Sequence, residues 1–211
     1  MRRLASIILI ICLSLVLMII SIEQNSYNKK YYKDFFKKQN IERVSHRSTD
    51  ELSNIVDNII LYLKAKGGDG LLTPYFNERE ILHMQDVQGL FKLARYIKYI
   101  GFLVSIYISI YLIKKKDSIF LSKILSYGLS ANYIVLSILV FLIHSNFNKY
   151  FTYFHLIFFR NTLWILDPNT DLMIQMLPEE FFIGMAKNIV LSFFIYLSII
   201  QILAYLYIKT S

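Results

Sequence analysis

The chain contains little cysteine, proline or glycine: one cysteine, three prolines and seven glycines among 211 residues. The single cysteine, Cys12, excludes an intrachain disulfide, and its place in an apolar run is typical of a small hydrophobic residue. No proline or other helix stop occurs from Glu78 to Ile113. That stretch is therefore predicted to form one continuous helix.

Charged residues are also scarce, at 18% of the chain, whereas 55% of the residues are hydrophobic. The mean hydropathy of +0.45 is too high for an ordinary soluble domain of this size. The chain has 16 tyrosines and 16 phenylalanines, and tyrosine is favoured where a membrane meets water. The composition indicates a membrane protein.

The net charge of +8 does not indicate nucleic-acid binding, because the basic residues are divided among short segments that flank apolar runs. Attraction to lipid headgroups and the control of membrane topology account for that distribution better. The sequence has neither a glycine after Met1 nor a C-terminal prenylation motif, so no lipid anchor is expected.

Four apolar runs approach the roughly 20 residues that a spanning helix needs: 4–22, 96–113, 124–143 and 189–208. The first follows Arg2 and Arg3 and could be a signal peptide. It is long, however, and no small-residue cleavage pattern follows it, so we interpret it as a retained anchor. The fold class expected is an all-α membrane protein, a single membrane domain over 1–211 with four transmembrane helices and a helical extracytoplasmic cap.

Basic residues in the short connections predict the orientation. They lie before the first run, between the second and third runs, and after the fourth: Arg2, Arg3, Lys114, Lys115, Lys116, Lys123 and Lys209. All of these positions fall on one side, which is then cytoplasmic together with both termini. Segments 23–95 and 144–188 are expected on the outer face.

The first outer segment contains signals for helices. Residues 23–47 mix lysine with tyrosine and phenylalanine, and either an interfacial amphipathic stretch or a loosely packed arm fits them. Ser48 and Glu51 match a capping box before an amphipathic helix that ends at Gly67-Gly68. Asn77 and Glu80 repeat the capping pattern at the start of the long helix.

The second outer segment begins with an aromatic run over 147–164, followed by a turn at 167–171. Pro178 suits the first turn of a helix, and Glu179 and Glu180 suit its positive end. Titratable side chains from both outer segments gather at one membrane face under this topology, and such a group is typical of a site: His83, Asp86, His155, Arg160, Asp167, Asp171, Glu179 and Glu180.

The strings "FNEREILHMQDVQGLF" and "FHLIFFRNTLWILDPNTDLMIQMLPEEFF" resemble the bacterial lipoprotein intramolecular transacylase family. The resemblance rests on His-x-x-Asp-Val before the second span and on Phe-His, a later Trp, Asp-Pro, Asp and Pro-Glu-x-Phe before the fourth. Chain length, span number and motif order agree, so it covers nearly the whole chain except 23–47.

The resemblance implies an acyltransferase of the bacterial cytoplasmic membrane that acts at the outer face. It moves the sn-2 acyl chain of an S-diacylglyceryl lipoprotein to the α-amine of the same N-terminal cysteine, which gives the lyso form. The partners expected are the diacylated lipoprotein and membrane lipids, with no nucleic acid. The protein is expected to be a monomer without a cofactor or metal.

This reaction is ester aminolysis, and an α-amine with a pKa of about 7.7–8 must lose a proton to attack. Histidine, with an ordinary pKa of about 6.5, is a suitable base. His83 is the first choice, and Asp86 one turn on could orient its ring. His155 is the second candidate, as proton donor or oxyanion stabiliser, and an acyl-imidazole route is an alternative.

The remaining site residues are assigned to the oxyanion or the substrate. Arg160 and Asn161 are candidate donors to the oxyanion. Trp164 belongs to the aromatic run that would hold acyl chains, and Asp167, Asp171 or Glu179 could bind the protonated amine.

Two other functions fit part of the pattern. Two histidines with Asp86 or Asp171 could ligate zinc in a metal-dependent hydrolase, although no tight metal-binding spacing is present. A non-enzymatic sensor or assembly factor could use the aromatic and basic outer segments to bind a partner.

Overall fold

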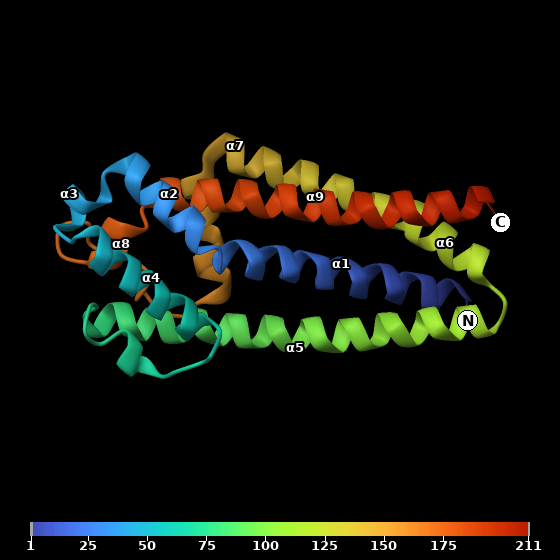
Figure 1. Cartoon of the computed structure of the whole chain (residues 1–211), viewed down its shortest axis with the longest axis horizontal. Coiled ribbons are helices and arrows are strands. Elements are labelled where there is room, and N and C mark those ends of the chain that lie inside the picture. The colour runs from blue at the N-terminus through green and yellow to red at the C-terminus, as the bar shows by residue number, and fades with distance from the viewer. Residues whose placement is uncertain (1, 211) are drawn as a thin grey trace. The chain divides into compact units, whose positions relative to one another are not determined.

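The computed structural model describes residues 2–210, and within that range every regular element is a helix (Figure 1). The α-helices are α1 (Arg2–Ser26), α2 (Lys29–Gln39), α3 (Ile41–Ser45), α4 (Thr49–Leu63), α5 (Glu78–Lys114), α6 (Ser118–Tyr127), α7 (Ala131–Phe158), α8 (Leu172–Met176) and α9 (Glu179–Thr210). Two 3₁₀ turns, η1 (Asp69–Leu71) and η2 (Gly128–Ser130), complete the list. The all-α prediction is confirmed.

Four helical stretches are long and apolar enough to cross a membrane: Arg2–Ser26, Glu78–Lys114, Ser118–Phe158 and Glu179–Thr210. They contain the four predicted apolar runs, so the prediction of four candidate spans is confirmed. Most of the side chains in their apolar windows are not buried within the chain, as expected of helices whose outer faces contact lipid. The side on which each terminus lies stays a prediction.

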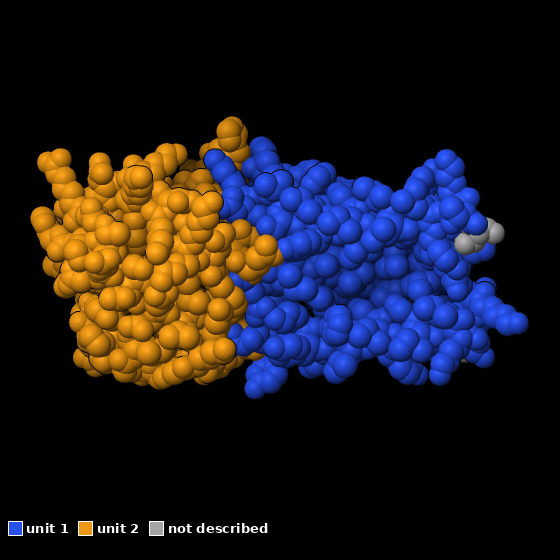
Figure 2. Space-filling model, viewed as in Figure 1, with its two compact units in different colours: residues 1–23, 94–142, 187–211 blue, residues 24–93, 143–186 orange. Residues whose placement is uncertain are grey.

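The chain divides into two compact units, shown in Figure 2. Unit 1 comprises Met1–Glu23, Ala94–Leu142 and Lys187–Ser211, and unit 2 comprises Gln24–Leu93 and Ile143–Ala186. All four long helices, α1, α5, α7 and α9, are divided between the units, although only the last three residues of α1 belong to unit 2. The single membrane domain expected over 1–211 stays a prediction.

Unit 1 is held together by two clusters of buried apolar side chains. One joins α1, α5 and α6 and comprises Leu9, Ile108, Leu112, Leu121 and Ile124. The other joins α1, η2, α7 and α9 and comprises Leu17, Leu129, Leu136, Phe193 and Leu197. Gly101 of α5 permits a close approach to α1, since a Cβ there would lie 3.3 Å from the carbonyl oxygen of Cys12.

The third predicted span is interrupted, because η2 separates α6 from α7 and frees a carbonyl group in an apolar region. Gln201 of α9 compensates: its Nε2 donates to the carbonyl of Ser126 at 2.9 Å and to Oγ of Ser130 at 3.1 Å. Its side-chain carbonyl accepts from the hydroxyl of Tyr133. The break is therefore satisfied within unit 1, as backbone at membrane depth requires.

In unit 2, α2 buries the side that carries Tyr32, Phe35 and Phe36. The rings of Tyr32 and Phe35 lie 4.8 and 5.2 Å from the ring of Phe181 in α9. The hydroxyl of Tyr31 donates to the carbonyl of Phe181 at 2.7 Å. Of the two interpretations of residues 23–47, a loosely packed arm does not fit, because the aromatic side of α2 belongs to the core of unit 2.

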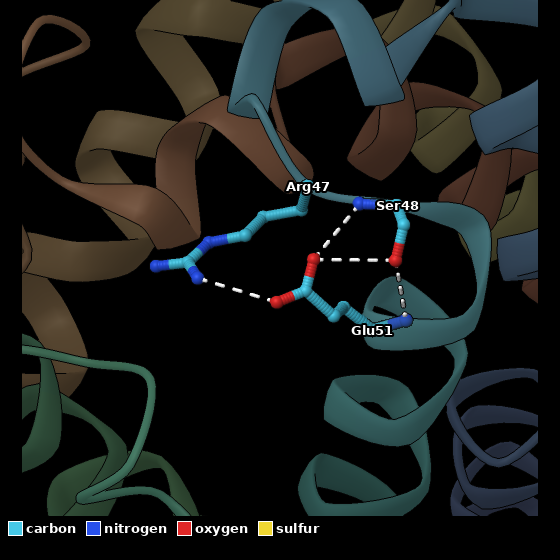
Figure 3. Close-up of polar contacts among 3 residues, drawn as sticks. All are labelled: Arg47, Ser48 and Glu51. Carbon is cyan, nitrogen blue, oxygen red and sulfur yellow. Dashed lines mark hydrogen bonds and ion pairs between the residues drawn. The ribbon is translucent and has the colours of Figure 1, made fainter.

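The capping box predicted before α4 is present (Figure 3). Oγ of Ser48 accepts from the N–H of Glu51 at 3.3 Å, and the Glu51 carboxylate accepts from the N–H of Ser48 at 3.0 Å. Arg47 forms an ion pair with the same carboxylate at 3.5 Å. These contacts lower the pKa of Glu51, with the Ser48 backbone N–H as the largest cause. The helix then buries the predicted apolar side, including Leu52, Ile55 and Ile59.

Candidate functional site

The first catalytic candidate lies on the opening turns of α5, a continuous helix of 37 residues. Its predicted capping box is formed: Oδ1 of Asn77 accepts from the N–H of Glu80 at 3.0 Å, and the Glu80 carboxylate accepts from the N–H of Asn77 at 2.8 Å. His83 follows one turn later. The cap therefore fixes the helical register of His83.

Glu80 also connects this turn to a distant segment. The residue is 1% exposed, and the second oxygen of its carboxylate accepts from the N–H of Met173 in the first turn of α8 at 2.6 Å. One buried carboxylate thus caps two helices. Asn77 adds a second link, because its Nδ2 donates to Oδ1 of Asp171 at 2.9 Å.

The other flank of α5 is attached to η1 and α4. Nε2 of Gln85 donates to Asp69 at 2.8 Å, and Nε2 of Gln88 donates to the carbonyl of Tyr62 at 2.8 Å. The hydroxyl of Tyr62 donates to the same Asp69 carboxylate at 2.8 Å. Burial, followed by this carboxylate, raises the pKa of Tyr62. The helix that carries His83 is therefore fixed by contacts with α8 on one side and with η1 and α4 on the other.

The second catalytic candidate, His155, lies near the end of α7. Its Nδ1 is 2.7 Å from the carbonyl oxygen of Phe151. Because a carbonyl oxygen only accepts, this contact requires a proton on Nδ1. In the neutral ring Nε2 is then the nitrogen with the free lone pair.

The two imidazole rings face each other inside unit 2. Their centroids are 6.1 Å apart and their planes are inclined by 34°, and the residues are 8% and 7% exposed. Phe159 packs against both, with ring centroids 5.4 Å from His83 and 5.5 Å from His155. Nδ1 of His83 is buried without a hydrogen-bond partner among the described residues. A buried polar atom without a partner is unusual in a stable structure.

The loop after α7 connects to this pair. Nδ2 of Asn161 donates to Oδ2 of Asp86 at 2.7 Å, and the carbonyl of Asn161 accepts from Nε1 of Trp164 at 3.0 Å. The indole stacks on His155, with ring centroids 4.8 Å apart and planes inclined by 27°. Arg79 clamps the same loop by donating to the carbonyl of Thr162 at 2.7 Å. The predicted residues Asp86, Asn161 and Trp164 are thus joined to the histidine pair.

Asp167 and Asp171 build the turn before α8. Oδ1 of Asp167 accepts from the backbone and side chain of Asn169, both at 2.9 Å. Asp171 accepts from the N–H of Asp167 at 2.7 Å and from the hydroxyl of Thr170 at 3.1 Å. Burial by itself would raise the pKa of Asp171, but the bonds from Asp167, Asn77 and Thr170 outweigh it and lower the pKa. These bonds engage both oxygens of Asp171 and one oxygen of Asp167.

The last two predicted site residues are not joined to the pair by any of these contacts. Arg160 is exposed and makes no ion pair within residues 2–210. Glu179 begins α9, as predicted, and accepts from Nδ2 of Asn148 at 2.7 Å.

The sequence left several residues of the site unassigned. Phe151 and Phe159 contact the histidines directly, but nothing in the sequence distinguishes them from the rest of the aromatic run. Arg79 and the second bond of Glu80 carried no local signal, because their partners lie 83 and 93 positions away. Across residues 2–210 no group of three or more histidine, cysteine or acidic side chains is placed to hold a metal ion.

Comparison with known proteins decides the family. The model of the family described as "Lipoprotein intramolecular transacylase Lit" matches residues 7–182, which is most of the chain. The chain belongs to the lipoprotein intramolecular transacylase family. This transacylase is therefore an enzyme, an acyltransferase, and the resemblance seen in the two sequence strings is confirmed.

Solved structures of a transacylase from Bacillus cereus are similar over the whole chain. The membrane integral lipoprotein intramolecular transacylase Lit of that organism is 28% identical, with a TM-score of 0.88, and the match covers 100% of this chain and 96% of the other. Two structures of the same enzyme with one histidine changed give TM-scores of 0.84 for the alanine mutant and 0.79 for the arginine mutant. Their identities are 27% and 28%, and both cover 100% of this chain, with 94% and 91% of the others. The comparison with curated proteins found no match.

Proposed function

We propose that this transacylase moves the sn-2 acyl chain of a diacylated lipoprotein from the glyceryl oxygen to the α-amine of the same N-terminal cysteine. The reaction takes place in the bacterial cytoplasmic membrane, at its outer face, and needs neither a cofactor nor nucleic acid. The enzyme works as a monomer on its lipoprotein substrate among membrane lipids. The observation that carries the proposal is the pair of buried, facing imidazoles in a member of this family.

The chemistry requires one proton acceptor and one proton donor. The amine nitrogen attacks the ester carbonyl carbon and loses a proton to the base. The tetrahedral intermediate then releases the glyceryl oxygen, which takes a proton from the acid. The N–C bond forms and the C–O bond breaks. The one proton that the amine nitrogen loses balances the one proton that the glyceryl oxygen gains, so the two histidines can carry it across without a net change in charge.

His155 is preorganised as the base. Its Nδ1 proton is held by the carbonyl of Phe151, which leaves the Nε2 lone pair free to accept the amine proton. The sequence alone favoured His83 for this role, but the tautomer required at His155 supports the reverse assignment. His83 then passes a proton to the leaving oxygen. Burial lowers the pKa of His83 to about 4, so its ring starts neutral and the proton it gives is replaced by the one that His155 took from the amine.

The surrounding residues assist the pair. Asp86, one turn from His83, places a negative charge near any imidazolium formed during the reaction, which stabilises it. The amide of Asn161 has two N–H groups and the bond to Asp86 uses one, so the other can donate to the oxyanion. Because donor ester and acceptor amine belong to one molecule, clamping that molecule in a bent pose supplies part of the rate.

Replacing either histidine tests the assignment. His83→Ala and His155→Ala should each abolish conversion of the diacyl form to the lyso form, measured by mass spectrometry of a reporter lipoprotein's N-terminus in cells. His144→Ala, an exposed histidine outside the pair, is the matched control and should convert normally. Normal conversion by both variants of the pair would refute the proposal.

A substrate with a sulfur in place of the sn-2 ester oxygen separates acid from base. A thiolate leaves without a proton donor, whereas the attacking amine still needs a base. The thioester should therefore restore turnover to His83→Ala but not to His155→Ala. The opposite pattern would assign the base to His83.

A further inference from the structure

The last part of α7, residues 147–158, is apolar around most of its circumference. One stripe, Phe151, His155 and then Phe159, faces the interior of unit 2, with His155 and Phe159 buried. Most of the side chains between them are exposed, and Ile157 reaches 75%. The exposed group, named here the apolar face, comprises Tyr153, Phe154, Leu156, Ile157 and Phe158. A helix that is apolar on nearly all sides is stable only in apolar surroundings.

The apolar face is concentrated, whereas the rest of unit 2 is not. The other large exposed apolar side chains of unit 2 are scattered over three helices and the loop after α7: Val44, Leu61, Leu82, Leu93 and Ile165. The exposed side of α2 instead carries Lys30, Lys33, Lys37 and Lys38, with Asp34 among them. The apolar face is therefore a distinct surface, larger than the scattered exposure normal for a protein in water.

The helix that carries this face is too long to cross a bilayer in one direction. The stretch Ser118–Phe158 has 41 residues, which corresponds to about 60 Å at 1.5 Å per residue. A hydrocarbon core is about 30 Å thick. Roughly half of the stretch must therefore lie outside a single crossing.

A break in the backbone separates the two halves. Asn146 has non-helical angles of φ −163° and ψ 82°. Its Oδ1 accepts from the N–H of Lys149 at 3.0 Å, as the cap of a new helix does. Residues 147–158 are thus a separate helix that does not have to continue along the direction of the span.

We propose that residues 147–158 form an interfacial helix whose apolar face is embedded in the acyl chains of the bilayer. Charge and aromatic placement support lipid as the occupant: between Lys149 and Arg160 the sequence has no residue with a permanent charge, and Tyr150 and Tyr153 suit the boundary with the headgroups. Continuity supports it too, because this helix directly extends a candidate span.

The proposal has a consequence for catalysis, which rests on the function proposed above. His155 lies on the same helix as the apolar face, so the helix holds the imidazole at the depth of the lipid interface. The ester carbonyl of a diacylglyceryl group occupies that depth. The lipid substrate therefore reaches the histidine pair sideways from the bilayer rather than through water.

Spin-label accessibility tests the position of the helix. In a Cys12→Ser background, a nitroxide is placed on Ile157→Cys, and the protein is reconstituted into phosphatidylglycerol–phosphatidylcholine liposomes. Val44→Cys, an exposed apolar position on α3, is the control for water, and Leu203→Cys, 63% exposed on the candidate span α9, is the control for lipid. Oxygen should enhance the spin relaxation of the label at position 157 more than a soluble nickel chelate does, as it should at position 203.

Two results would overturn the proposal. Access to the nickel chelate equal to that at position 44 would place the helix in water. Shielding from both oxygen and nickel would mean that a protein surface, such as a second copy, covers it. Neither measurement depends on turnover, so a failure here is distinguishable from a failure of the transacylation proposal.

Discussion

The contacts of individual side chains decide what each histidine can do. His155 has one nitrogen engaged by a backbone carbonyl, and His83 has a buried nitrogen with no partner among the described residues. Two chemically identical rings therefore start the reaction with different hydrogen-bonding capacities. That difference is the physical basis for dividing the acid and base roles between them.

Replacing Glu80 should most disturb the helix turn that positions His83. Its carboxylate accepts from the N–H groups of Asn77 and Met173, and glutamine would turn an amide N–H toward one of these donors. Glu80→Gln should therefore lower the free energy of unfolding by about 1–3 kcal/mol, the cost of an unsatisfied buried donor. Thermal unfolding of the purified protein in detergent measures the effect.

The matched control is Glu78→Gln in the same turn, because Glu78 is exposed. It should leave the unfolding temperature nearly unchanged. Equal shifts for the two variants would show that Glu80 acts through the charge of the helix terminus and not through its buried bonds.

At the scale of the elements, local sequence signals predict the helix boundaries that the structure has. Both capping boxes, the uninterrupted α5 and the start of α9 after Pro178 occur where the sequence predicts them. Each depends on residues three or four positions apart, so a single segment of sequence contains the whole interaction. The interruption at η2 was not predicted, because its stabilising partner Gln201 lies on another helix. The break at Asn146 was not predicted either, although its cap to Lys149 is local.

In the candidate site too, the sequence predicts which residues take part but not their long-range partners. Composition and topology predicted that His83 and His155 belong to one site. The partners of Asp86 and Asn161 were not predicted, since the bond between them joins segments 75 positions apart. Asp171, a candidate for binding the substrate amine, has one oxygen engaged by Asn77 at the start of α5 and the other by the turn before α8.

The capping box of α4 gives a prediction for an element. Ser48→Ala removes the acceptor for the N–H of Glu51 and should destabilise the protein by about 0.5–2 kcal/mol. Chemical denaturation of the purified protein measures the loss. Asn54→Ala, exposed in the middle of the same helix, should be neutral or slightly stabilising because alanine is the better helix former. A loss at Asn54 as large as at Ser48 would contradict the capping role.

At the scale of the whole molecule, the chain combines four candidate spans with a unit that contains both histidines. Family membership identifies the protein as a transacylase and favours an enzyme over a sensor or assembly factor. The buried histidine pair supplies the groups that ester aminolysis needs. The central claim is that donor and acceptor are parts of one lipoprotein molecule.

A crossover experiment tests that claim most directly. Purified enzyme receives a mixture of an unlabelled diacyl lipopeptide and one that carries heavy isotopes in both its peptide and its sn-2 acyl chain, and mass spectrometry follows the N-acylated products. The account predicts lyso-form products in which a heavy acyl chain occurs only on heavy peptide and a light chain only on light peptide. Mixed products, or free fatty acid in place of N-acylation, would contradict it.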